Sequence, residues 1–148
     1  MPQSLARNVV HLIFSTKKRE PYIVESIRDR LFRYLAGTLN ELGCPALSVG
    51  GVADHVHLLF VLSRKITLSK VVEEVKKSSS KWMKENGEPR FYWQNGSGAF
   101  SVSASNEENV IAYIANQEAH HRTRSFQNEF REFLRKHKIE WDEQYVWD

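Results

Sequence analysis

The sequence has a single cysteine, Cys44, among its 148 residues, and only 7 glycines and 4 prolines. One thiol cannot form an intramolecular disulfide or a zinc site built from cysteines, so we expect a reducing, cytoplasmic location. The low glycine and proline content excludes collagen-like and low-complexity chains, and 11% aromatic residues argues against disorder. The length fits one globular core, so we predict a single domain over residues 1–148.

Long hydrophobic runs and a strong excess of one charge are also missing. No apolar run approaches the roughly 20 residues that cross a bilayer, and residues 1–7 lack the apolar stretch of a signal peptide. We therefore expect neither membrane insertion nor export. The 21 basic and 18 acidic residues leave a net charge of +3. Binding of an anionic polymer would thus depend on clustered charge.

Apolar periodicity predicts four strands and four helices. Thr67 and Ser125 are suited to begin helices, and Gly43 follows a long amphipathic segment as a helix stop. The order is β-α-β-β-α-β followed by two helices, which indicates an α+β, ferredoxin-like antiparallel sheet with helices on one face plus two C-terminal helices. The predicted strands are residues 8–15, 44–52, 55–62 and 99–104, and the predicted helices are residues 24–42, 67–84, 106–122 and 125–137.

Two histidines lie in one of these apolar strands. His55 and His57 flank a single valine, and the two-residue period of a strand places both imidazoles on the same face. Such a pair can bind one metal ion. Two surface or core-edge histidines would give the same pattern, so the motif alone is a weak signal.

A polar stripe is predicted on the third helix. Tyr113 and Gln117 are four residues apart and share one face, which continues through His120 and Arg124. An adjoining apolar stripe would dock this helix on the sheet. A core-edge tyrosine and a solvated glutamine would explain the helix by itself, but together with the histidine strand a common site is the better interpretation.

The HVH strand at residues 55–57 and the YIANQ segment at residues 113–117 make the chain resemble the single-tyrosine HUH transposases of small bacterial insertion sequences. Those elements move as single-stranded DNA. The resemblance spans nearly the whole chain, including the VVHLIFSTKKR strand, the GAFSVS strand, the HHR after the tyrosine helix and the closing WDEQYVW segment. One loop departs from the family, which often has an aromatic residue where Ser97 stands.

The resemblance implies roles for four residues. His55, His57 and Gln117 would hold a divalent metal, and Tyr113 would attack DNA. The implied activity is that of a DNA transposase, a site-specific single-stranded DNA endonuclease and strand transferase acting on hairpin-bearing element ends. It also implies a homodimer, since one tyrosine per chain must serve two cleavages, and it leaves open whether Tyr113 acts in its own chain or completes the metal site of the partner. Association with the nucleoid is implied when the protein is on DNA.

Phosphodiester chemistry is consistent with these roles. Mg²⁺ or Mn²⁺ bound by two imidazoles and an amide oxygen keeps its charge and open positions for the scissile phosphate. Zinc is less expected, because a thiolate or third histidine ligand is not evident. Attack by Tyr113 would give a 5′-phosphotyrosine and a free 3′-hydroxyl, which rejoining could use without ATP. His120 and His11 are candidates for accessory roles, although a solvated His120 and a structural His11 are the simpler interpretations.

Basic residues cluster in two places. Residues 64–84 hold seven basic and two acidic side chains, and one helix face there could follow a phosphate backbone, although an ordinary solvated face would look the same. A second basic turn follows the first strand. The candidate DNA-binding residues are Lys17, Lys18, Arg19, Lys70, Lys77, Lys81 and Arg124.

Two alternatives remain open. A non-catalytic single-stranded nucleic-acid-binding module of RRM-like architecture would need only the basic helix and the aromatic residues. It does not explain the two histidines, the tyrosine and the glutamine together. A relative repurposed to act on chromosomal hairpin repeats would keep the chemistry, and flanking DNA would distinguish it.

Overall fold

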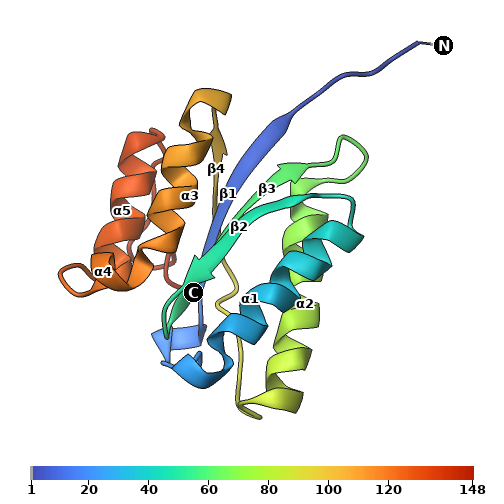
Figure 1. The fold of residues 1–148 in the computed structure, drawn as a ribbon. Helices are drawn as coiled ribbons and strands as arrows, with labels where there is room; N and C mark the ends of the chain where they lie inside the picture. Colours follow the sequence, from blue (N-terminus) through green and yellow to red (C-terminus); the bar gives the residue numbers. More distant parts are fainter. Residues whose placement is uncertain (1) are drawn as a thin grey trace.

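The computed structural model describes residues 2–148; Met1, the first residue of the predicted domain, lies outside the described residues. Four antiparallel strands form one sheet in the order β2-β3-β1-β4, which confirms the predicted α+β fold (Figure 1). No helix within residues 2–148 is long and apolar enough to cross a membrane. The elements are β1 (Asn8–Ser15), η1 (Lys17–Arg19), α1 (Glu25–Glu41), β2 (Ala46–Gly51), β3 (His55–Leu62), α2 (Leu68–Asn86), β4 (Gly98–Val102), η2 (Ala104–Asn106), α3 (Glu107–Ala115), α4 (Gln117–His121) and α5 (Phe126–Lys136).

Helices cover both faces of the sheet. In Figure 1, α1 and α2 lie on one face, and α3, α4 and α5 lie on the other. Side chains of β1 alternate between the two sides, as the strand period requires. Leu12 and Phe14 belong to the larger core, which contains residues of α1 and α2, whereas Ile13 packs with Phe126 and Phe130 of α5. The central strands are therefore nearly continuous apolar runs.

Two helix starts are confirmed by their caps. The Thr67 hydroxyl accepts a hydrogen bond from the backbone N–H of Lys70 at 3.1 Å, at the start of α2. The Ser125 hydroxyl accepts one from Asn128 at 3.2 Å, at the start of α5. Each cap satisfies a backbone donor that the first helical turn leaves unpaired.

The single helix predicted over residues 106–122 is wrong. The chain leaves helical geometry at Asn116, with φ of −103° and ψ of 23°, so that α3 ends at Ala115 and α4 begins at Gln117. Asparagine tolerates this departure because its side chain competes with helical backbone hydrogen bonds. The C-terminal part thus has three helical segments where two helices were predicted.

The position of α3 depends on a glycine in the edge strand β2. A Cβ atom on Gly50 would lie 2.8 Å from Ile114 Cγ2 and 2.9 Å from the Ile114 carbonyl oxygen. The backbone of α3 therefore packs directly on the backbone of β2. Tyr113 is the neighbour of Ile114, so this contact also helps to place the candidate nucleophile.

Replacing Gly50 by alanine is expected to lower the free energy of unfolding by about 1–3 kcal/mol, because the added methyl group overpacks this contact. Gly37→Ala is the matched control. Gly37 lies on the exposed side of α1, and a Cβ atom there would meet nothing within 4 Å, so alanine should add about 0.5–1 kcal/mol. Urea denaturation measures both. Equal effects of the two substitutions would show that α3 does not rest on Gly50.

Candidate active site

His55 and His57 lie at the start of β3, on the sheet face covered by α3, α4 and α5. Both side chains are fully buried, and their register partners on β1 are Ser15 and Ile13. Val56, between them, points into the opposite core. The strand period thus puts both imidazoles on one face, as the sequence predicted.

Gln117 and Tyr113 reach the same place from either side of the break at Asn116. Gln117 Oε1 lies 3.1 Å from His55 Nε2, and the Gln117 side chain is buried. The Tyr113 hydroxyl donates a hydrogen bond to Glu129, a residue of α5. The structure therefore brings the two histidines, the glutamine and the tyrosine together, even though they do not share one continuous helix.

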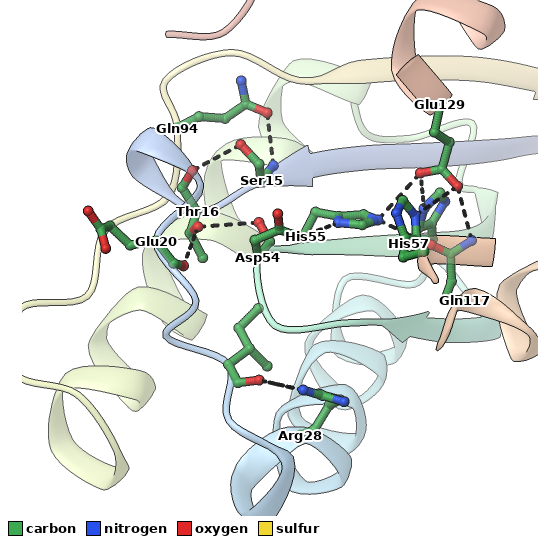
Figure 2. Close-up of polar contacts among 12 residues, drawn as sticks. Ser15, Thr16, Glu20, Arg28, Asp54, His55, His57, Gln94, Gln117 and Glu129 are labelled. Carbon is green, nitrogen blue, oxygen red and sulfur yellow. Dashed lines mark hydrogen bonds and ion pairs between the residues drawn. The ribbon is translucent and has the colours of Figure 1, made fainter. Parts of the chain in front are cut away.

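A buried carboxylate that the sequence reasoning missed occupies the centre of this group (Figure 2). Glu129 Oε1 lies 3.0 Å from His57 Nε2 and 3.4 Å from His55 Nε2. Glu129 Oε2 lies 3.2 Å from His121 Nε2 and accepts hydrogen bonds from Gln117 Nε2 at 3.3 Å and from the Tyr113 hydroxyl. Five side chains from β3, α3 and α4 thus converge on one carboxylate of α5.

The Nδ1 atoms of His55 and His57, which lie on the far side of each ring from Glu129, also have polar partners. His55 Nδ1 lies 2.7 Å from Asp54 Oδ1, and His57 Nδ1 lies 2.8 Å from His11 Nε2. Such outer contacts orient the imidazoles of metal sites and determine which ring nitrogen faces the ion. His11, a candidate accessory residue, is buried behind His57.

Burial and hydrogen bonding move the pKa values of the site in different directions. Burial lowers the pKa of His57 to about 4 and that of His11 to about 3. For His55, hydrogen bonds to Asp54 and Glu129 outweigh burial and raise its pKa to about 9. Burial would raise the pKa of Glu129, but hydrogen bonds from the surrounding histidines hold it well below its usual range. The contacts within the site therefore favour the charged forms of both Glu129 and His55, and binding of a metal ion would require His55 to give up its proton.

The surroundings of the Tyr113 phenol favour its neutral, protonated form. Burial and the neighbouring Glu129 carboxylate both raise its pKa above the ordinary value. A negative charge next to the hydroxyl disfavours a phenolate. Ionisation of Tyr113 would consequently become easier when positive charge offsets the carboxylate.

The residues present fit a divalent metal ion. One ligand atom from each of His55, His57, His121 and Glu129 lies within 4.8 Å of the others. His121 Nε2 is buried and lies 3.2 Å from Glu129 Oε2, and in the part of the chain that the structure describes it has no other polar partner. His121 also supplies the third histidine that the sequence argument against zinc took to be missing.

Glu129 did have a signal in the sequence. Phe126, Phe130 and Phe133 lie at helical spacing on one face of α5, and Glu129 falls on that same face. A carboxylate on an apolar stripe is rarely buried unless it is paired. His121 was noted in the sequence only as part of the HHR segment of the family resemblance and received no role there.

Two further candidate residues lie beside Tyr113. The ring of His120 stacks on the tyrosine ring, with centroids 4.4 Å apart. Arg124 pairs with Glu132 and lines a hollow of about 50 Å³ together with Tyr113 and Lys136. The outer side of the tyrosine is thus bordered by two cations and by the Glu132 carboxylate. The sequence reasoning did not single out one of these cations, Lys136.

The lysines of α2 lie away from this site. Lys70 pairs with Glu74 at 3.1 Å, while Lys77 and Lys81 line a groove of about 430 Å³ that also contains Trp82. The sheet separates α2 from α3, α4 and α5 (Figure 1). Lys17, Lys18 and Arg19 form η1 directly after β1, whose last residue is paired with His55. The structure therefore places the basic turn, and not the basic helix, at the site's end of the sheet.

Residues 4–117 match the family described as "Transposase IS200 like". The chain belongs to this family. This confirms the resemblance seen in the sequence and identifies the chain as a DNA transposase. The matched part includes His55, His57, Tyr113 and Gln117, and it ends before Glu129. No curated protein matches the sequence of this IS200-like transposase.

Two solved structures share the fold of the transposase. One is a candidate transposase from Deinococcus radiodurans R1, with 23% identity and a TM-score of 0.63, and the match covers 79% of this chain and 98% of that one. The other is a REP-associated tyrosine transposase bound to a REP hairpin, with 12% identity and a TM-score of 0.59, covering 82% of this chain and 73% of that one. At these identities the likeness supports the fold alone.

Proposed function

We propose that this transposase cleaves and rejoins single-stranded DNA through a covalent bond between Tyr113 and the 5′-phosphate. One observation carries the proposal: the Tyr113 hydroxyl meets the same buried carboxylate that contacts His55 and His57. DNA binding by a non-catalytic, RRM-like module does not require a buried carboxylate surrounded by three histidines, and burying such a charge costs free energy. The nucleophile and a candidate metal site would then act on one phosphate.

His55, His57 and Gln117 would hold Mg²⁺ or Mn²⁺, with Glu129 as an additional oxygen ligand and His121 within reach. Carboxylate and amide oxygens are ligands that these hard cations prefer. When bound, the ion would offset the Glu129 charge and polarise the non-bridging oxygens of the phosphate. Asp54 and His11 would keep the imidazoles oriented.

Cleavage would form a bond between Tyr113 Oη and phosphorus and break the bond between phosphorus and the 3′-oxygen. The phenol loses its proton and the 3′-oxygen leaves with one, so the products are a 5′-phosphotyrosine and a free 3′-hydroxyl. Arg124 and Lys136, on the outer side of the ring, would contact the phosphate backbone. Rejoining reverses the step with a different 3′-hydroxyl.

The proposed substrate is a single strand with a hairpin at the element end. A REP hairpin is the DNA bound by one structure of the same fold, which supports a hairpin here. Two cleavages are needed for each excision, so we propose a homodimer that works on DNA in the nucleoid. Tyr113 contacts Glu129 of its own chain, and each chain would therefore contribute one complete site.

Covalent capture tests the proposed function. Labelled single strands from the flanking DNA are incubated with Mg²⁺, Mn²⁺ or EDTA and separated on denaturing gels. The expected result is a metal-dependent protein–DNA adduct, and mass spectrometry should find the nucleotide on the peptide that contains Tyr113. Tight binding without an adduct on any hairpin-bearing strand would support the RRM-like binding module instead.

Metal ions are expected to stabilise the folded protein. At a concentration about 100 times the Kd, a ligand that binds only the folded state adds about 2.7 kcal/mol of stability. Thermal melts with Mn²⁺, Mg²⁺ and Zn²⁺ measure the effect, and EDTA should reverse it. Strong stabilisation by Zn²⁺ without adduct formation, and none by Mg²⁺ or Mn²⁺, would contradict the proposed cofactor and indicate a closed zinc site.

A further inference from the structure

A small hollow lies between the basic turn η1 and the C-terminal segment. Its volume is about 190 Å³, and its walls are Lys17, Lys18, Arg19, Gln94, Trp147 and Asp148. Three cations thus face one carboxylate, an amide and an indole. This combination of donors and an aromatic surface suits a nucleotide better than a purely apolar or purely anionic ligand.

The cations of the hollow are available. Among residues 2–148, no side chain forms an ion pair with Lys17, Lys18 or Arg19, and both lysines are exposed. By contrast, Lys70 and Arg124 are already paired with glutamates. Unpaired cations can neutralise phosphates without first breaking an ion pair.

The backbone of η1 is held in an uncommon conformation. Lys18 has φ of 56° and Arg19 has φ of 58°, in the left-handed region that residues other than glycine seldom adopt. Two such residues in succession cost free energy, and a protein keeps such strain most often at a functional site. Here the two residues with this conformation are consecutive in the turn after β1, and both line the hollow.

The hollow lies close to the candidate active site. Gln94 Oε1 accepts a hydrogen bond from the backbone N–H of Ser15 at 2.8 Å, and Ser15 is the register partner of His55 (Figure 2). On the other wall, the ring centroids of Trp147 and Phe126 are 6.3 Å apart, and those of Phe126 and His55 are 4.6 Å apart. Two ring contacts therefore separate the hollow from a candidate metal ligand.

The walls of the hollow are tied to each other. The Asp148 carbonyl oxygen accepts hydrogen bonds from the Gly96 N–H at 2.7 Å and from Gln94 Nε2 at 3.5 Å. The Lys76 ammonium donates hydrogen bonds to the carbonyl oxygens of Gln94 and Gly96. The loop and the C-terminal segment thus form a prearranged site, which lowers the cost of ordering on binding.

We propose that this hollow binds an unpaired nucleotide of the DNA strand that enters the active site, with its phosphates on η1 and its base against Trp147. The identity of the strand rests on the proposed function. The hollow would fix the register of the strand, so that one particular phosphate reaches Tyr113. Base contact would come from an aromatic residue and backbone contact from cations, as in other sites for unpaired nucleotides.

The test separates the phosphate and base contributions. Fluorescein-labelled oligo(dT) and an abasic strand of the same length are bound in EDTA, so that no cleavage takes place, and fluorescence anisotropy gives each Kd. The double variant Lys18→Gly/Arg19→Gly removes both cations and suits the left-handed backbone. It should weaken both strands about tenfold and reduce the salt slope of log K by about 0.7 for each lost phosphate contact.

Lys138→Gly is the matched control. Lys138 is also an exposed lysine in the left-handed region, with φ of 58°, but it does not line the hollow. It should leave both affinities and the salt slope near the wild-type values. An equal loss in Lys138→Gly and in the double variant would mean that only general charge matters, and the proposal would be rejected.

Trp147→Leu tests the base contact. It should weaken oligo(dT) about tenfold and leave the abasic strand unchanged. The unchanged abasic strand also shows that the variant is folded, and circular dichroism checks this independently. Equal losses for the two strands, or tighter binding of duplex than of oligo(dT) by the wild type, would overturn the proposal.

The two proposals can fail separately. If Tyr113 forms no adduct while the variants of the hollow and the Lys138→Gly control bind DNA as described, the nucleotide site is supported and the proposed cleavage chemistry is rejected. If the adduct forms and none of these variants changes binding, the chemistry stands and the hollow is not a nucleotide site.

Discussion

A Tyr113→Phe transposase is expected to form at least about 10³-fold less covalent protein–DNA adduct than the wild type, because phenylalanine lacks the oxygen that would bond to phosphorus. The substitution removes one hydroxyl and keeps the ring that stacks on His120. DNA binding in EDTA should therefore stay within about threefold of the wild type. Denaturing gels measure the adduct, and fluorescence anisotropy measures the binding.

Tyr145→Phe is the matched control, since Tyr145 is 62% exposed and lies outside the site. This variant should form as much adduct as the wild type. If Tyr113→Phe also kept wild-type levels of adduct, another side chain would be the nucleophile and the role of Tyr113 would be rejected. Loss of both adduct and binding would instead point to a binding role of the ring.

Replacing Glu129 by glutamine should weaken Mn²⁺ binding by about tenfold to hundredfold. This is the range found when side chains around a bound metal ion are replaced. The amide has nearly the same shape but carries no charge to pair with His55 or with a cation. Removal of one partner from a buried ion pair is also expected to lower the free energy of unfolding by about 3–5 kcal/mol. Calorimetric Mn²⁺ titration measures the first effect and urea denaturation the second.

Glu140→Gln provides the comparison for this variant. Glu140 is exposed, and its side chain makes no hydrogen bond or ion pair with any residue that the structure describes. Its replacement should change neither metal affinity nor stability. A Glu129→Gln variant with unchanged Mn²⁺ affinity would remove Glu129 from the set of ligands, and the effect on stability would then measure only the buried ion pair.

Strand and helix patterns were sufficient to predict most of the fold. The alternation around His55 and His57, the caps at Thr67 and Ser125, and the order of elements all follow from local spacing, and the structure confirms them. The break at Asn116 does not follow from spacing. Several of its neighbours are good helix formers, and the close contact of Ile114 with Gly50 of β2 just before the break is visible only in the folded structure.

Local spacing singled out two pairs among the four family residues, and the resemblance to the family joined the pairs into one site. Glu129 could not be singled out in this way, since it meets His57 from 72 residues away. Only the folded chain brings α5 over the histidine strand. The apolar stripe of α5 would have marked Glu129 as unusual, but no local rule would have named its partners.

The charge on the buried face of α5 couples the docking of this helix to the histidine strand. Burial of Glu129 as a carboxylate is favourable only when the β3 histidines pair with it, since an unpaired buried carboxylate is strongly unfavourable. A chain in which the histidine strand is misformed would lose the partners of Glu129 and, with them, part of the free energy that buries Phe126 and Phe130. Formation of the candidate metal site and docking of α5 are thereby energetically linked.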